Sequence, residues 1–135
     1  MGNIVPATAG MRLTAAWLNQ FIPGSWAACS VANSWTNHGG GSSPLSARLV
    51  NAVTMQVVGA MNPGTTSSGT TIGTLPSSAY YPTTVQWGTI LILAGTSVGT
   101  VVPVGIYPNG NIQLAATALP SSTEVFVNAL VALDV

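Results

Sequence analysis

The sequence contains almost no charge. Of its 135 residues, two are Lys or Arg and two are Asp or Glu, and the formal net charge is zero, whereas an ordinary domain is about 25% charged. Nucleic-acid binders set several basic side chains against phosphates and release counterions. The shortage of basic residues therefore argues against DNA, RNA and anionic membrane surfaces as partners.

Cysteine and histidine are also scarce, with one of each, Cys29 and His38. One cysteine forms no internal disulfide, and a zinc site needs three or four Cys or His ligands. A Ser-His-Asp triad could use only His38 and Asp134, and a carboxylate pair for glycoside cleavage only Glu124 and Asp134. We therefore expect no catalysis, no metal and no cofactor, although three copies of His38 around a threefold axis could bind a metal.

Long hydrophobic runs are missing too. The longest apolar stretches, such as 90–94 and 129–133, have the length of a strand, whereas a membrane-spanning helix needs about 20 apolar residues. The N-terminus lacks the basic start and apolar segment of a secretory signal, so we expect synthesis in a cytoplasm and no membrane insertion. The chain has instead 47% hydrophobic residues, 15 Gly, 13 Ser and 16 Thr. This composition predicts a hydroxyl-rich surface. Because charged side chains are not there to prevent exposed strand edges from pairing with other chains, we expect the edges to be covered by closure of the sheet or by assembly.

Apolar periodicity predicts strands after one short helix. Residues 15–21 follow a capping hydroxyl and precede Pro-Gly, which indicates one or two helical turns. The apolar face of this helix must be buried against something, and as oligomer contacts we predict Trp17, Leu18 and Phe21. Residues 1–24 would then form an arm for attachment or trimerisation, and residues 25–135 a head domain.

The head domain contains a clear β-hairpin signal. Apolar residues alternate over 102–106 and again over 112–114, on either side of a turn that contains Asn109-Gly110. Pro103 lies in the first strand, which we expect to be an edge strand or bulged. About seven or eight short strands predict an antiparallel sandwich or barrel. The fold class that this pattern predicts is all-β and antiparallel, with a short N-terminal helix.

Aromatic side chains are the best candidates for ligand binding on a nearly uncharged surface, because each has an apolar face and, in Tyr and Trp, a polar group. The candidates are Tyr81, Trp87, Tyr107 and, in the hairpin turn, Asn109. Core or subunit packing is the competing interpretation for each aromatic. Two other tryptophans, Trp26 and Trp35, lie in an alternating stretch and are predicted to fill the core.

Several motifs occur in a fixed order from Trp35 onward. They are Trp35-Thr36-Asn37 before a Gly-rich loop, Pro44-Leu45-Ser46-Ala47-Arg48, Val57-Val58-Gly59, Thr71-Ile72-Gly73-Thr74-Leu75-Pro76, Tyr80-Tyr81-Pro82 and the stretch from Val104 to Ile112. This order resembles the C-terminal head domains of phage tail fibre and baseplate receptor-binding proteins. The family's pattern often has Arg where this chain has Tyr81.

The resemblance implies a homotrimeric head whose fold is a jelly-roll-like, antiparallel β-sandwich. It also implies that the head is attached to other virion proteins through its N-terminal segment and recognises a bacterial surface glycan or protein. On that basis we expect a virion-associated, non-catalytic receptor-binding protein at a tail fibre tip. The main alternative is a structural decoration, capsid or collar protein with no receptor role. A stand-alone lectin-like module and a glycan depolymerase are further alternatives.

Overall fold

The computed structural model describes residues 14–19, 21–115 and 117–134. The described chain is all-β and antiparallel, as predicted, apart from two short helical segments. These are α1 (Ala15–Asn19) and the 3₁₀ turn η1 (Ser78–Tyr80). The strands are β1 (Ala27–Ala28), β2 (Ser30–Val31), β3 (Thr36–Asn37), β4 (Ser46–Asn51), β5 (Thr54–Asn62), β6 (Thr71–Thr74), β7 (Gln86–Ala94), β8 (Val101–Ile106), β9 (Asn111–Leu114) and β10 (Glu124–Ala132).

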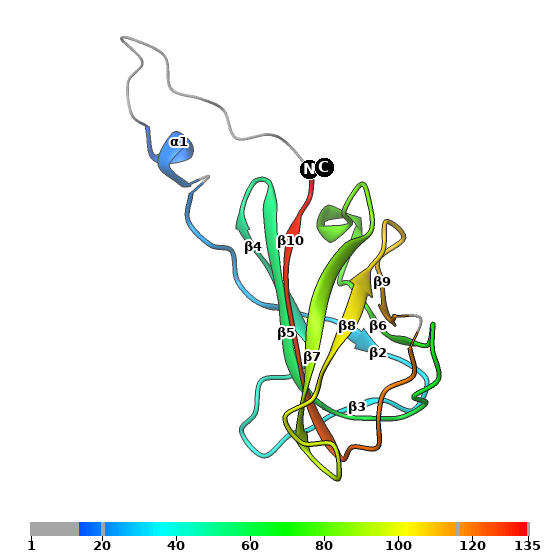
Figure 1. The fold of residues 1–135 in the computed structure, drawn as a ribbon. Helices are drawn as coiled ribbons and strands as arrows, with labels where there is room; N and C mark the ends of the chain where they lie inside the picture. The colour runs from blue at the N-terminus through cyan, green and yellow to red at the C-terminus, as the bar shows by residue number, and fades with distance from the viewer. Residues whose placement is uncertain (1–13, 20, 116, 135) are drawn as a thin grey trace.

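The strands form a single antiparallel sheet that nearly closes into a barrel (Figure 1). The strand order is β1-β4-β5-β10-β7-β8-β9-β6-β2, and β3 pairs with β5 beside this path. The two ends of the order, β1 and β2, are adjacent in the chain and separated only by Cys29. The segment 27–31 therefore pairs with β4 through its first half and with β6 through its second half, which brings the two edges of the sheet together.

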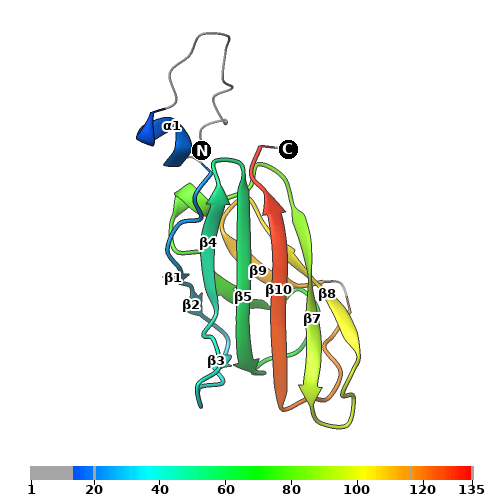
Figure 2. The same ribbon diagram turned by 90° about the vertical axis from the view of Figure 1, so that its left-hand side faces the viewer.

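Backbone hydrogen bonds continue this closure beyond the paired residues. The Cys29 N–H donates to the Leu45 carbonyl at 2.9 Å, and the Ala32 N–H donates to the Ile72 carbonyl at 3.0 Å. Closure leaves few free strand edges for pairing with other chains, which matters in a chain without the Lys residues that normally protect an edge. The long strands β4, β5, β10 and β7 run side by side on one side of the molecule (Figure 2).

The core lies inside the barrel and consists of the inward side chains of the strands, and it includes the alternating residues of 102–106 and 112–114 that the sequence predicted. In β10, Val125, Val127, Ala129 and Val131 are at most 2% exposed, while Leu130 points outward and is 68% exposed. The inward positions of the other long strands are buried in the same way, namely Met55, Val57 and Met61 in β5, Ile90 and Ile92 in β7, Val104 and Ile106 in β8, and Ile112 and Leu114 in β9.

The predicted hairpin is present as β8 and β9. The Gly110 N–H donates to the Tyr107 carbonyl across the turn, and the Tyr107 N–H to the Asn111 carbonyl, both at 2.9 Å. β8 lies between β7 and β9, so it is not an edge strand as a whole. Its register with β9 begins only at Val104, so Pro103 pairs with β7 alone and its missing N–H interrupts no ladder.

The two tryptophans predicted to fill the core behave differently. Trp35 is 2% exposed, and its indole N–H donates to the Thr65 carbonyl at 2.8 Å, so this prediction is confirmed. Trp26 is 45% exposed, so the same prediction is wrong for it. The reason is that successive strand residues point to opposite faces: Cys29 points into the core, so Trp26, three residues earlier, lies on the outer face.

None of the described helices is long and apolar enough to cross a membrane.

Candidate functional site

The outer face of β7, β8 and β10 is apolar and exposed. Facing residues in the ladders place Phe126, Leu91 and Val101 in one row, with Asn128, Thr89 and Pro103 in the next. The exposed large apolar side chains of these three strands are Trp87 (57%), Leu91 (36%), Leu93 (40%), Val101 (56%) and Leu130 (68%). We call this surface the β7–β8–β10 face. Its apolar character suits contact with a protein or with the apolar faces of sugars.

Trp87 and Tyr107 meet at one end of this face. Trp87 pairs with Gly105 across the β7–β8 ladder. A methyl group on Gly105 would lie 2.7 Å from Tyr107 Cε2 and 3.3 Å from Trp87 Cζ3, so both rings rest on the glycine backbone. Trp87 is 57% exposed and Tyr107 is half-buried. Two of the four predicted ligand residues are thus brought together as an aromatic platform.

The other two predicted ligand residues have structural roles in the same hairpin. The half-buried Tyr81 ring packs against Gly110, where an added methyl group would lie 2.3 Å from Tyr81 Cε1. Asn109 is exposed, but its side-chain Oδ1 accepts the backbone N–H of Asn111 at 3.0 Å. Tyr81 and Asn109 therefore fix the shape of the turn that carries Tyr107.

The predicted oligomer contacts lie partly outside the described residues. Nothing is described of the Trp17 side chain. Leu18 is 48% exposed and Phe21 is 47% exposed, and the adjoining Ile22 is 61% exposed. About half or more of each of these three side chains is therefore exposed, and the burial of Trp17, Leu18 and Phe21 in an oligomer stays a prediction.

A concave surface lies on the outer side of β1, β4 and β5, apart from the β7–β8–β10 face, and it was not predicted from the sequence. It is lined by Trp26, Ala28, Ser43, Pro44, Ser46 and Val58, and its volume is about 410 Å³. We call it the Trp26 trough. One feature of the sequence could have predicted it. Successive strand residues point to opposite faces, so a buried Cys29 places Ala28 on the outer face, and Trp26 with it.

Arg48 lies beside this trough and is held by neighbours on both sides. Its guanidinium carbon lies 4.6 Å from the centroid of the Trp26 ring, which is a cation–π contact. Its Nε and Nη2 donate to Gln56 Oε1 at 3.3 and 3.2 Å. Trp26, which directly precedes β1, thus contacts Arg48 of β4, and Arg48 in turn contacts Gln56 of β5.

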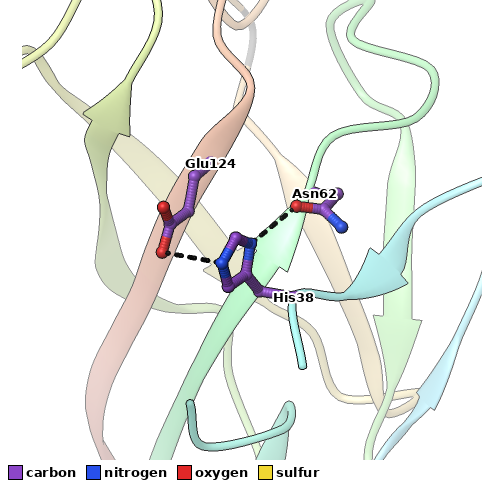
Figure 3. A network of polar contacts seen from close by, with 3 residues as sticks. All are labelled: His38, Asn62 and Glu124. Atoms are coloured by element: carbon purple, nitrogen blue, oxygen red, sulfur yellow. Dashed lines mark hydrogen bonds and ion pairs between the residues drawn. The ribbon is translucent and has the colours of Figure 1, made fainter. Parts of the chain in front are cut away.

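His38 and Glu124 form a polar network with Asn62 on the outer side of β3, β5 and β10 (Figure 3). His38 Nδ1 lies 2.9 Å from Asn62 Oδ1, and Nε2 lies 3.6 Å from Glu124 Oε1. The Nδ1–H donates to the amide oxygen, and Nε2 faces the carboxylate. The network becomes an ion pair when the imidazole is protonated.

This network braces the Gly-rich loop that follows β3. The loop begins at Gly39, Gly40 and Gly41, whose φ angles of +77°, +61° and +88° favour glycine. It ends where the Leu45 N–H donates to Asn37 Oδ1 at 2.8 Å. The loop supplies Ser43 and Pro44 to the Trp26 trough, and the Ala60 N–H ties it to β5 by donating to the Ser43 carbonyl at 2.9 Å.

The remaining titratable side chains offer little chemistry. Cys29 is buried, and burial raises the pKa of its thiol to about 12, so it is a neutral thiol at ordinary pH. Among the described residues there is no group of three or more His, Cys, Asp or Glu placed to hold a metal ion. His38, the chain's histidine, is engaged with Asn62 and Glu124.

Comparison with known proteins identified no relative of this chain. Neither a scan against protein-family models nor a search of the curated proteins found a match to this chain. The resemblance to phage tail fibre head domains therefore stays a prediction.

Proposed function

We propose that this protein is a non-catalytic binding subunit of a virion, at the tip of a tail fibre, which recognises a bacterial surface glycan or protein. The observation that carries this proposal is the aromatic platform of Trp87 and Tyr107 on Gly105. A platform of this kind can stack on the apolar face of a sugar ring or of a protein side chain without any charge pairing. The motifs shared with tail fibre head domains supply the virion context.

The finer fold that belongs to this proposal is a jelly-roll-like head. It is supported by the position of β10, which pairs between β5 and β7 although β6 separates those two strands in the sequence. Such a return of a late strand between earlier ones is typical of Greek-key folds, from which jelly rolls are built. A homotrimer, with α1 and the N-terminal arm directed toward the rest of the virion, completes the proposal.

The alternative of a purely structural virion protein is favoured by a different observation. Beyond Trp87, the exposed side chains of the β7–β8–β10 face are aliphatic, namely Leu91, Leu93, Val101 and Leu130. Aliphatic faces are typical of permanent subunit contacts rather than of reversible recognition. Burial of Trp87 between copies of the chain would favour this alternative.

The experiment that tests the proposal is binding of labelled protein to a panel of bacterial envelopes and to a glycan array. Replacing Trp87 by Ala should weaken binding by at least about tenfold, because central aromatic residues dominate binding energies. Val98→Ala is the matched control, since Val98 is 62% exposed but lies in the β7–β8 turn. No binding across the panel, or equal binding by the Trp87 variant, would contradict receptor recognition through this face.

A further inference from the structure

The floor of the Trp26 trough is built from small outward side chains on three adjacent strands. Ala28 faces Ser46 across the β1–β4 ladder, and Ser46 faces Val58 across the β4–β5 ladder. The larger groups that complete the lining are Trp26 and Pro44. The volume of about 410 Å³ lies within the range of ligand pockets, which is about 300–1,000 Å³.

Ser46 provides an unused polar group in this floor. It is only 7% exposed and is the one buried polar residue of the described chain. Its hydroxyl makes no hydrogen bond with a described residue, yet no buried side-chain oxygen or nitrogen in that part of the chain lacks a partner. The hydroxyl oxygen must therefore reach the surface of the trough, where a ligand can bond to it. A buried hydroxyl without a partner is costly unless water or a ligand satisfies it.

Arg48 provides an unpaired positive charge at the edge of the trough. The chain has only two carboxylate side chains, Glu124 and Asp134. Glu124 faces His38, and within the described residues no ion pair reaches Arg48. The Nε and Nη2 donors of Arg48 go to Gln56, whereas Nη1 has no acceptor among the described residues. Because no buried donor is unpaired there, Nη1 is open to an incoming group.

From these three features we propose that the Trp26 trough binds an acidic sugar of a glycan, a pyranose ring that carries a carboxylate. The apolar face of the ring packs on the Trp26 indole, and a ring hydroxyl bonds to the Ser46 hydroxyl. The carboxylate is bound by Arg48, whose guanidinium is already oriented by Trp26 and Gln56. The inference rests on the proposed function, since it assumes that the recognised surface is a glycan.

An acidic sugar would use all three features, namely the apolar lining with Trp26, the Ser46 hydroxyl and the Arg48 guanidinium. Each of the other ligand classes would leave at least one of them without a contact. A neutral sugar would use Trp26 and Ser46 but leave Arg48 unmatched. A phosphate alone would use Arg48 but leave the apolar floor without contact. An acidic peptide segment is the competing macromolecular ligand, and it would not need the hydroxyl of Ser46.

The test is titration of the purified protein with oligosaccharides of alginate, polygalacturonate and hyaluronan. Each is used beside the same material with its carboxyl groups reduced to alcohols. At least one acidic probe should bind, and reduction should weaken its binding by at least about tenfold, since a charge-assisted hydrogen bond is lost. The inference fails if none of the acidic probes binds, or if a reduced probe binds as well as its parent.

Variants then localise the binding. Arg48→Gln and Trp26→Ala should each weaken it by at least about tenfold, and Arg48→Lys should recover part of the loss, because lysine keeps the charge but not the planar fork. Ala28→Leu should block the floor without removing any polar group. Ala28 is exposed, so this variant should fold even if Trp26→Ala does not. Unchanged binding by Ala28→Leu and Arg48→Gln would overturn the inference, and Val98→Ala serves as the control.

Envelope binding separates this inference from the proposed function. If Trp87→Ala abolishes envelope binding and the trough variants do not alter it, the trough inference fails and receptor recognition stands. If the wild-type protein binds no envelope but the acidic probes bind in the trough, receptor recognition fails and the trough is a glycan site of another kind.

Discussion

Closure of the barrel positions the Trp26 trough, and one glycine tests this directly. Gly73 lies in β6 opposite β2, where a methyl group would be 2.6 Å from the Ser30 carbonyl oxygen and 2.7 Å from Leu45 Cδ2. Ordinary contacts of a methyl group are 3.4–4 Å. Gly73→Ala therefore requires either the segment 27–31 or Leu45 to move by most of an ångström.

The expected cost follows from these contacts. Overpacking a filled site costs about 1–3 kcal/mol. Displacement of the segment 27–31 would also weaken the hydrogen bonds from Cys29 to Leu45 and from Ala32 to Ile72, each worth about 0.5–1.5 kcal/mol. We expect the free energy of unfolding to fall by about 2–3 kcal/mol, and the melting temperature to fall by roughly 6–10 °C.

Urea unfolding, with acrylamide quenching of tryptophan fluorescence, measures both effects. Quenching should increase in Gly73→Ala because Trp26 precedes the displaced segment. Gly24→Ala is the matched control: it adds a methyl group three residues before the segment 27–31, where the nearest atom, the Leu49 carbonyl oxygen, is 3.5 Å away. Its stability should change by less than about 0.5 kcal/mol. Equal stability of the two variants would refute the claim that the close β2–β6 approach closes the barrel.

Two further predictions concern the titratable groups. Burial raises the pKa of the Cys29 thiol from 9.0 to about 12, so the folded state disfavours the thiolate. Its contribution to stability should be fully present below pH 9.0 and fall by about 1.4 kcal/mol per pH unit between 9.0 and about 12. Urea unfolding across this pH range should show that slope for the wild type but not for Cys29→Ala. The same dependence of the free energy of unfolding on pH in both proteins would contradict the prediction. Glu124→Gln removes the carboxylate that faces His38 and should cost less than about 1 kcal/mol, because both side chains are partly exposed. The cost should diminish in high salt and vanish in a His38→Asn background, and a double-mutant cycle without coupling would show that the pair contributes nothing.

The sequence predicted those parts of the fold in which apolar and polar residues alternate over several positions. β8, β9 and the Asn109-Gly110 turn are of this kind, since burial on one face fixes the inward positions. Closure was not predictable, because β1 and β2 have two residues each and their partners are distant in the sequence. A strand that changes partner at Cys29 leaves no periodic signal.

The candidate site was predictable only in part, for a related reason. Trp87 and Tyr107 were predicted as ligand residues, and the structure brings them together on Gly105. Trp26 was assigned to the core because its neighbours are all small or apolar, and only its odd spacing from the inward Cys29 indicates that it lies on the opposite face. Arg48 and Gln56 join Trp26 only through the β1–β4–β5 register, which no local pattern contains.

The shortage of charge makes the position of each charge informative. In a domain with the usual proportion of charged residues, an Arg without a carboxylate neighbour would say little, because surface ion pairs contribute little and exchange readily. Here Glu124 faces His38, and Asp134 forms no ion pair with a described residue, so nothing in the described chain neutralises Arg48. The guanidinium is nevertheless oriented by an indole and an amide beside a hollow whose floor has an unused hydroxyl. A composition that argues against nucleic acids and catalysis thus directs attention to the Trp26 trough, where we propose that a charged ligand group binds.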